Sequence, residues 1–595
     1  MLGQRVSLLG ALSFGALILA APIPDSPVAD AARSGDLEAV RTLLRQGADV
    51  NAAQGDGMTA LHWAAQNGDA PMLRVLLYAG ANAEATTRLG GYTPLHLASQ
   101  QGLGEAVKVL LEGGSKAAAE TTTGASAIHL AAAAGRPDAV AVLLQGGADL
   151  NARESYADRT PLMFATASNR LEVMQVLLTA GADVSLATTV VDFAERSKAD
   201  DVEQRRRARV IAAAKEPAGP PRDSTAPRAQ RRPEQTQPPD PDAPSVPDSA
   251  RPRGPRPLSY EDWVGRQGGF TALHFAVRDG RAEAVRLLLE SGAPVNGVTA
   301  GDHSTPLLIA VINGHYDLAV ELLGRGADPK VASEDGATPL FATLNSEWAL
   351  RTWHPQPTAW QQQKTTYLEL MEALLKAGAD PDARVNTHIW YAAYNAGRMG
   401  VDYSGATALW RAAYATDVRA MRLLTAYGAD PNIPTIKPAQ GRFPGAANRS
   451  RDSTEAEEKD PTGLPPVPVG GPAVHPLHAA SGVGYGTSRV GQQHRHVPDG
   501  WLPAVRYLVE ELEVDVNVRD HDGYTAVHNA AARGDNEMIQ YLVEHGADVT
   551  LLSRRGQTTV DMANGPQQRV QPFPETIALL ERLGAKNNNK CQSCE

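Results

Sequence analysis

The chain has 595 residues, a formal net charge of −11 and a pI of about 5.8. This acidic balance excludes the broad basic surface that binds nucleic-acid phosphates, so we expect no nucleic-acid partner. The only two cysteines, Cys591 and Cys594, are too close together for a disulfide that would close a large stabilising loop.

Residues 1–21 carry one early positive charge, Arg5, followed by an uncharged and mostly apolar run from Val6 to Ala21. This pattern is typical of a secretory signal, and the run is short for a membrane span. A clean cleavage site is missing, since Pro22 follows the small residues at the end of the run. We therefore expect an exported protein that is periplasmic, part of the cell envelope or secreted. Its N-terminal segment is either removed or kept as a membrane anchor.

Residues 90–123 form the clearest copy of a repeated unit. Thr93 is placed as the N-cap of a first helix, with Pro94 at the first helical position, where the missing N–H costs nothing. Gly102 ends this helix. A second helix follows and stops at Gly113-Gly114, where a left-handed backbone costs glycine little. The unit is predicted to be helix, turn, helix and loop.

The opening pattern of this unit recurs about every 33 residues over much of the chain. Its copies begin at Thr59, Thr93, Ser126, Thr160, Thr271, Thr305, Thr338, Thr407, Pro476, Thr525 and Thr558. The pattern resembles the ankyrin repeat family, and the resemblance covers roughly three quarters of the chain. It implies an all-α solenoid in two arrays, residues 28–187 with about five units and residues 266–584 with about seven.

The two arrays are joined by residues 188–265. The repeat period is lost over residues 188–215, where residues 190–215 fit one polar helix, and the proline- and arginine-rich stretch that follows has too few large apolar residues to offset the entropy of ordering. We predict a disordered linker there. The spacing of the repeat pattern also predicts four insertions in the second array. They span residues 346–365, 384–405, 433–471 and 481–503.

Aromatic residues gather in and around these insertions. Such side chains give large contact areas at low entropy cost, which suits a recognition surface. They would equally suit a satellite core that fixes long loops to the solenoid, and the sequence leaves both interpretations open. The candidate partner-binding residues are Trp353, Trp360, Trp390, Tyr391, Tyr394, Tyr403 and Tyr485.

The histidines that follow leucine in the repeats are periodic, which indicates a structural role. By resemblance to ankyrin proteins, they should hydrogen-bond backbone groups of neighbouring repeats. His494 and His496 give two ligands at most, so we expect no metal site and no cofactor. For Cys591 and Cys594, in an Asn-rich tail (residues 585–595), three roles stay open: a local disulfide, a surface metal half-site or an intermolecular link.

No set of nucleophile, base and orienting residue is recognisable, so we expect no enzymatic activity. The resemblance implies a monomeric scaffold that binds a protein through its concave face and through the aromatic insertions of the second array. A second hypothesis is metal or redox handling by the C-terminal cysteines and nearby histidines. A membrane contact is expected only if the N-terminal segment is retained.

Overall fold

The computed structural model describes residues 26–215, 260–349, 357–387, 401–438, 460–485, 494–565 and 571–590. The chain divides into two compact units, unit 1 to Val184 and unit 2 from Ser185 onward. The expected signal segment, the proline-rich linker and the two cysteines lie outside the described residues. No helix of the described residues is long and apolar enough to cross a membrane.

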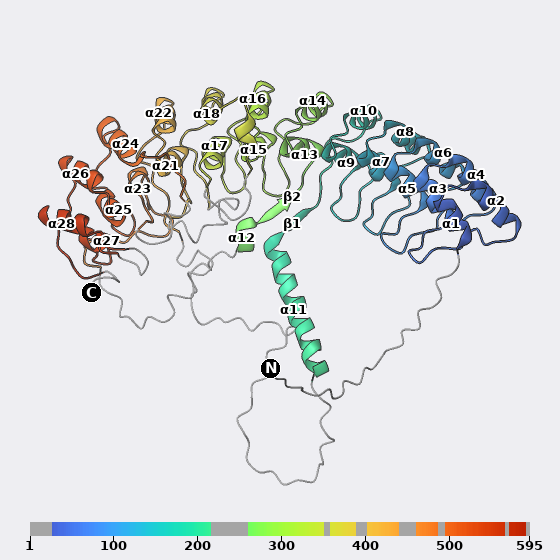
Figure 1. The fold of residues 1–595 in the computed structure, drawn as a ribbon. Coiled ribbons are helices and arrows are strands. Elements are labelled where there is room, and N and C mark those ends of the chain that lie inside the picture. Colours follow the sequence, from blue (N-terminus) through green and yellow to red (C-terminus); the bar gives the residue numbers. More distant parts are fainter. Residues whose placement is uncertain are drawn as a thin grey trace, which may run out of the picture. The chain divides into compact units, whose positions relative to one another are not determined.

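Unit 1 consists of helix pairs (Figure 1). The first helices pack side by side in one layer and the second helices, apart from α2, pack in another. The pairs are α1 (Pro27–Arg33) and α2 (Leu37–Arg45), α3 (Ala60–Asn67) and α4 (Ala70–Tyr78), α5 (Pro94–Gln101) and α6 (Gly104–Glu112), α7 (Ala127–Ala134) and α8 (Pro137–Gln145), and α9 (Pro161–Ala167) and α10 (Leu171–Thr179).

The predicted start and stop signals are confirmed in α5. Thr93 has extended backbone angles and its hydroxyl accepts a hydrogen bond from the His96 N–H. Pro94 is the first helical residue, and Gly102 ends the helix at φ +70°, where a side chain would be strained. Leu95 and Leu110 are buried in the core between the two layers. The capping residue and the terminal glycine thus set the ends of the helix, and packing of its apolar face against neighbouring helices stabilises the helix.

Unit 2 repeats this arrangement with long connections. Its pairs are α13 (Ala272–Arg278) and α14 (Ala282–Glu290), α15 (Pro306–Ile312) and α16 (Tyr316–Gly324), α17 (Pro339–Glu347) and α18 (Tyr367–Lys376), α21 (Ala408–Tyr414) and α22 (Val418–Ala426), α23 (Pro476–Ser481) and α24 (Trp501–Arg506), α25 (Ala526–Arg533) and α26 (Asn536–Glu544), and α27 (Thr559–Ala563) and α28 (Pro574–Arg582). A short 3₁₀ helix, η1 (Ala359–Gln362), lies before α18, and α24 continues into a π-helical turn, η3 (Tyr507–Glu511).

Unit 2 begins with an element that the sequence did not indicate. The strand β1 (Val190–Asp192) pairs antiparallel with β2 (Arg266–Gly268), which follows the short helix α12 (Tyr260–Val264). The predicted polar helix therefore starts later than Val190, as α11 (Phe193–Lys215). The β-branched residues Val190 and Val191 favour the strand. This pairing brings together the two ends of the stretch of chain that contains α11.

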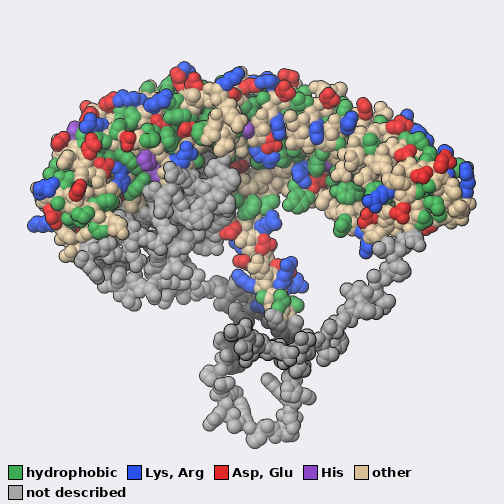
Figure 2. Space-filling view, in the orientation of Figure 1, with side chains coloured by type: hydrophobic (Ala, Val, Ile, Leu, Met, Phe, Trp, Pro, Cys, Tyr) green, Lys and Arg blue, Asp and Glu red, His purple; other side chains and the backbone are tan. Residues whose placement is uncertain are grey.

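The insertions lie at two places relative to the helices. Residues 346–365 and 481–503 fall between the two helices of a pair, α17–α18 and α23–α24. Residues 384–405 and 433–471 fall between helix pairs, where the loops of successive pairs hydrogen-bond to one another. Figure 2 shows that acidic and basic side chains are intermixed over the second helices of the pairs, which we call the outer helices. The features specific to unit 2 therefore lie at helix turns and in the loops between pairs.

Candidate functional site

Unit 2 contains a cleft of about 260 Å³ between the loops and the first helices of its C-terminal pairs. Three of the insertions contribute to it, through Val401 and Asp402, through Thr435, Ile436 and Pro438, and through Val483 and Gly484, and α25 and α27 add Asn529 and Met562. The lining residues are Val401, Asp402, Thr435, Ile436, Pro438, Ala473, Val474, Val483, Gly484, Asp520, His521, Asp522, Tyr524, Asn529, Arg555 and Met562.

The wall of this cleft is built by backbone hydrogen bonds between loops. The Thr435 N–H donates to the Val474 carbonyl at 2.9 Å, and the Ala473 N–H donates to the Thr435 carbonyl at 2.8 Å. On one side the Ile436 N–H donates to the Ser404 carbonyl at 2.8 Å, and on the other the His521 N–H donates to the Ala473 carbonyl at 3.1 Å. Three successive inter-pair loops therefore form one continuous edge.

Carboxyl groups fix the turns beside the cleft. Oδ1 of Asp520 accepts hydrogen bonds from the N–H groups of Asp522 at 3.0 Å and Tyr524 at 2.8 Å. Burial, followed by the nearby charge of Asp522, raises the pKa of Asp520 to about 8. Oδ1 of Asp402 accepts from the N–H and the hydroxyl of Ser404 in the same manner. These acids shape the loops and give the cleft a polar lining beside its apolar residues.

The lining is suited to binding rather than to bond-making chemistry. It combines exposed charges of both signs, Asp522 and Arg555, with apolar side chains such as Val483 and Met562. Within the described ranges, no group of three or more His, Cys, Asp or Glu residues is arranged to hold a metal ion. A short polypeptide segment would match this mixture of charges and apolar contacts.

A second cluster lies at the helix turns, where the insertions after α17 and α23 approach the short α21–α22 turn. Trp348 Nε1 donates to Asp417 Oδ2 at 3.0 Å, and the Tyr367 hydroxyl donates to the same oxygen at 2.6 Å. From the other insertion, His494 Nε2 bonds the Tyr414 carbonyl at 2.7 Å. Trp348, Tyr367 and His494 thus fix these insertions to the α21–α22 pair.

Of the predicted partner-binding residues, three are described. Tyr403 is fully buried and packs edge-on against Trp410, with ring centroids 5.5 Å apart. Tyr485 is half-buried against Trp501 at 5.5 Å, and Trp360 is half-buried beside Gly314, where a Cβ would lie 2.8 Å from its backbone nitrogen. Of these three residues, Tyr403 packs fully inward, and Tyr485 and Trp360 keep part of their surface exposed. Trp353, Trp390, Tyr391 and Tyr394 lie outside the described residues.

The predicted role of the periodic histidines is confirmed for five of them, whereas Nε2 of the sixth, His528, makes no such bond within the part of the chain that the structure describes. In α3, the Thr59 N–H donates to Nδ1 of His62 at 3.1 Å, so this nitrogen is the acceptor of the neutral ring. Nε2 then donates to the Tyr92 carbonyl of the next pair at 3.0 Å. His96, His129, His274 and His478 make equivalent bonds. Burial lowers the pKa of each of these rings, which stay neutral.

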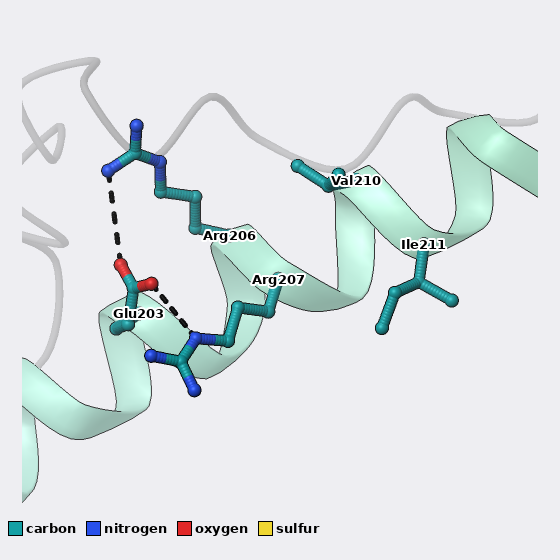
Figure 3. Close-up of a pocket in the computed structure, with 5 residues that line it drawn as sticks. All are labelled: Glu203, Arg206, Arg207, Val210 and Ile211. Atoms are coloured by element: carbon teal, nitrogen blue, oxygen red, sulfur yellow. Dashed lines mark hydrogen bonds and ion pairs between the residues drawn. The ribbon is translucent and has the colours of Figure 1, made fainter. Parts of the chain in front are cut away.

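The surface of α11 carries a different group of residues (Figure 3). Glu203 forms ion pairs with Arg206 at 3.9 Å and Arg207 at 3.0 Å, while Val210 and Ile211 are 64% and 55% exposed. All five residues belong to the same helix. The exposure of these side chains makes this an open surface and not an enclosed site.

Two features of the site could not be predicted from the sequence. The first is the cleft, which is formed by loops that are far apart in the chain. The second is the bonding of Arg554, in a later loop, to the inserted residues 460–465. A proline-rich stretch at residues 461–472 is visible in the sequence, but nothing local shows where it lies.

Comparison with known proteins gives a consistent result. A family model described as ankyrin repeats in three copies matches residues 28–120, 114–188 and 258–344, and a second ankyrin model matches residues 493–543. Together these segments cover about half of the chain.

Several curated relatives match shorter parts of the chain. Human BCL-6 corepressor-like protein 1 is 38% identical over 86 residues, which is 14% of this chain and 4% of that protein. The E3 ubiquitin-protein ligase KEG of Arabidopsis thaliana is 26% identical over 344 residues, 53% of this chain and 19% of that protein. Rat protein phosphatase 1 regulatory subunit 12A is 30% identical over 95 residues, 16% of this chain and 8% of that protein. The chain spans less than a fifth of the length of each of these relatives.

Proposed function

This chain belongs to the ankyrin repeat family, and from that premise we propose that it is a non-enzymatic scaffold that binds a polypeptide segment in the cleft of unit 2. Ankyrin repeats imply a role in protein–protein interaction, because stacked units present an extended surface of loops and first helices. The observation that carries the proposal is the cleft itself, walled by inserted residues and lined by both charged and apolar side chains.

The charge pattern of the cleft supports a peptide ligand with side chains of both signs. Asp522, with a side chain 45% exposed, and the exposed Arg555 are the accessible charges of the lining. Val483 and Met562 provide apolar contacts between them. The α17–α18 pair supports the site indirectly, because Trp348 after α17 and Tyr367 at the start of α18 both bond Asp417 of the α21–α22 turn.

The proposal is tested with the full chain immobilised and a displayed library of random peptides as the probe. Peptides that are enriched are then measured by fluorescence anisotropy against three proteins: wild type, Asp522→Arg and Glu537→Arg. Glu537 is an exposed acid on the outer helix α26, so its variant is the matched control for charge reversal.

We expect Asp522→Arg to weaken binding roughly tenfold, the size of about one charge-assisted contact, and Glu537→Arg to leave it unchanged. Equal binding by all three proteins, or no enriched peptide, would contradict the proposal.

We further propose that the protein acts outside the cytoplasm, as the N-terminal charge pattern indicates. The test is a phosphatase reporter that is active only after export, fused after residue 40, together with N-terminal sequencing of the mature chain. Cleavage after the apolar run indicates a signal peptide, and an intact N-terminus in the membrane fraction indicates an anchor. An inactive, cytoplasmic reporter would refute export.

A further inference from the structure

Arg554 connects three segments of unit 2. Its Nε donates to the His521 carbonyl of the preceding loop at 2.9 Å. Its Nη1 donates to Asp460 Oδ2 at 2.6 Å and to the Leu464 carbonyl at 3.2 Å, and its Nη2 donates to the Pro465 carbonyl at 2.7 Å. A planar guanidinium that satisfies one carboxylate and three carbonyls holds its partners in a fixed geometry.

The segment that Arg554 binds is the returning arm of an insertion. We call residues 460–474 the inserted arm. Its middle part is tied to Lys437, whose Nζ donates to the Val467 carbonyl at 2.8 Å. Its backbone pairs with the same residue, since the Lys437 N–H donates to Gly471 and the Gly470 N–H donates to the Lys437 carbonyl, both at 2.8 Å.

The inserted arm continues directly into the wall of the cleft. Ala473 and Val474, the last residues of the arm, line the cleft, and so do Thr435 and Ile436, with which they pair. The arm is therefore fixed at one end by Arg554 and forms the binding surface at the other. Movement of the arm would change the shape of the cleft.

A matching position in unit 1 shows which contacts are common to the fold. Arg88 has the same backbone role as Arg554. Its N–H donates to the backbone carbonyl of Asp56 in the preceding loop at 2.8 Å, as the Arg554 N–H does to the backbone carbonyl of Asp522 at 2.8 Å. Its Nη1 also donates to a carbonyl of that loop, Gly55, at 2.7 Å. Arg88 and Arg554 thus share one role, which is to hydrogen-bond their own loop to the preceding loop; we call this the loop stitching. The bonds to Asp460, Leu464 and Pro465 are additional.

We propose that Arg554 and Asp460 form a clasp that fixes the inserted arm and thereby positions the cleft wall for a polypeptide partner. The clasp joins loops that are not sequence neighbours, and both side chains are mostly shielded, at 18% and 34% exposure. A wall that is fixed before binding avoids the cost of ordering it in the complex. The positioning role rests on the proposed function, whereas the clasp itself does not.

The clasp is tested by amide hydrogen exchange on the full chain, without any ligand. The reporters are the N–H groups of Lys437 and Gly470, which lie between the clasp and the cleft. In Arg554→Ala we expect these amides to exchange roughly tenfold faster or more, the effect of losing several charge-assisted hydrogen bonds. Asp460→Asn should give a smaller acceleration in the same amides. Arg88→Ala reports the effect of losing the loop stitching in a loop that lacks the inserted arm.

Unchanged exchange at Lys437 and Gly470 in Arg554→Ala would overturn the clasp. If exchange rises instead throughout α25 to α28, the variant has loosened the whole region, and Asp460→Asn decides. Acceleration confined to the inserted arm in Asp460→Asn supports the clasp, and no change there overturns it.

The positioning role is tested with a peptide selected on the wild-type protein. We expect Arg554→Ala to weaken this peptide at least fivefold, while the thermal midpoint falls no more than in Arg88→Ala. Equal affinity despite faster exchange would overturn the positioning role and leave the clasp intact. If no peptide binds the wild-type chain, the proposed function and the positioning role fail together, and hydrogen exchange still tests the clasp.

Discussion

The third residue of a first helix joins one repeat to the next in several pairs of both units. Histidine makes this link in both units, and in α21 of unit 2 tryptophan makes it instead. In unit 1 this residue is a histidine in three pairs, and His96 Nε2 donates to the Ala119 carbonyl at 3.0 Å. At the same position in unit 2, Trp410 donates from Nε1 to the Val474 carbonyl at 2.9 Å. The residue that accepts this bond lies 64 positions along the chain, beyond an insertion.

This difference shows how a repeat accommodates an insertion without losing its link to the next repeat. The indole is larger than imidazole and reaches the same kind of acceptor, and its extra surface is covered by Tyr403 and by Tyr414, which stacks on it at 5.4 Å. In unit 2 histidine still makes this link in α13 and α23, and His478 reaches Tyr524 beyond an insertion. At α21 the link across an insertion is a buried aromatic cluster instead.

The largest expected effect comes from removing that cluster. Trp410→Ala deletes a fully buried side chain and its hydrogen bond, and should lower the free energy of unfolding by about 3–5 kcal/mol. His96→Ala in unit 1 should cost about 2 kcal/mol, because the ring is smaller and its partners are left unpaired. Urea unfolding of the full chain measures both. Equal losses would show that the aromatic cluster is not the stronger link.

The next effect is a loss of stability in acid. Burial lowers the pKa of His478 to about 3 and that of His528 to about 4, whereas a histidine in the unfolded chain has its ordinary value near 6.5. The unfolded chain therefore binds more protons below pH 6.5, and stability present above this pH falls as the pH drops toward 4. His478→Gln should reduce this loss by roughly 2 kcal/mol between pH 7 and pH 4.

Unfolding midpoints in urea at pH 7, 5.5 and 4 measure this effect. His62→Gln, at the equivalent position of unit 1, provides the comparison. An unchanged pH dependence in the His478→Gln protein would contradict the assignment of a neutral buried ring.

A smaller effect separates two buried acids that fix inter-pair loops. Burial raises the pKa of Asp520 in unit 2 to about 8, so the folded chain binds the extra proton, and stability falls as the pH rises from about 4 toward 8. Burial also acts to raise the pKa of Glu154 in unit 1, but hydrogen bonds from Arg159 and from the Tyr156 N–H outweigh it and lower the pKa. Stability from Glu154 is therefore present at neutral pH and lost in acid.

Asp520→Asn should raise stability at pH 8 by about 1–2 kcal/mol relative to pH 5, because the amide accepts the same two backbone hydrogen bonds without a charge. Glu154→Gln should instead lower stability at pH 7, because its bond from the Arg159 guanidinium loses its charge assistance. Unfolding free energies measured at pH 5 and pH 8 for Asp520→Asn, and at pH 7 for Glu154→Gln, test both expectations. The same sign for both substitutions would contradict the contrast between the two acids.

The smallest expected effect is on the outer helices. Arg74 and Glu105 form an ion pair at 2.6 Å between neighbouring pairs of unit 1, with both side chains more than half exposed. Solvent screening limits such pairs, so Arg74→Ala should change the free energy of unfolding by less than about 0.5 kcal/mol. A loss above about 1 kcal/mol, roughly twice the usual value for exposed pairs, would contradict this expectation.

The sequence predicted the parts of this fold that depend on nearby residues. Thr93 and Gly102 mark the ends of α5 through their own backbone preferences, and the period of the pattern places each helix pair. The roles of the periodic histidines could be inferred for the same reason. The spacing also showed where chain had been inserted, since each insertion lengthens the interval between two copies of the pattern.

The parts that were not predicted depend on where inserted residues travel. Trp410 is recognisable as the third residue of α21, but its acceptor, Val474, follows an insertion whose course no local signal gives. The same holds for Asp460 and Arg554, which are 94 positions apart. The strand β1 was missed because its three residues gain stability only from pairing with β2.

The link from Arg554 to the inserted arm has a consequence for how the C-terminal end of the solenoid opens. In an ordinary repeat array each unit is coupled only to its nearest neighbours, so the terminal units can detach one at a time. Here the loop between α26 and α27 is tied to the arm that precedes α23, across the intervening α25–α26 pair. This adds a second-neighbour coupling to a one-dimensional array. The last pairs should therefore unfold together, with one cooperative transition in place of gradual fraying.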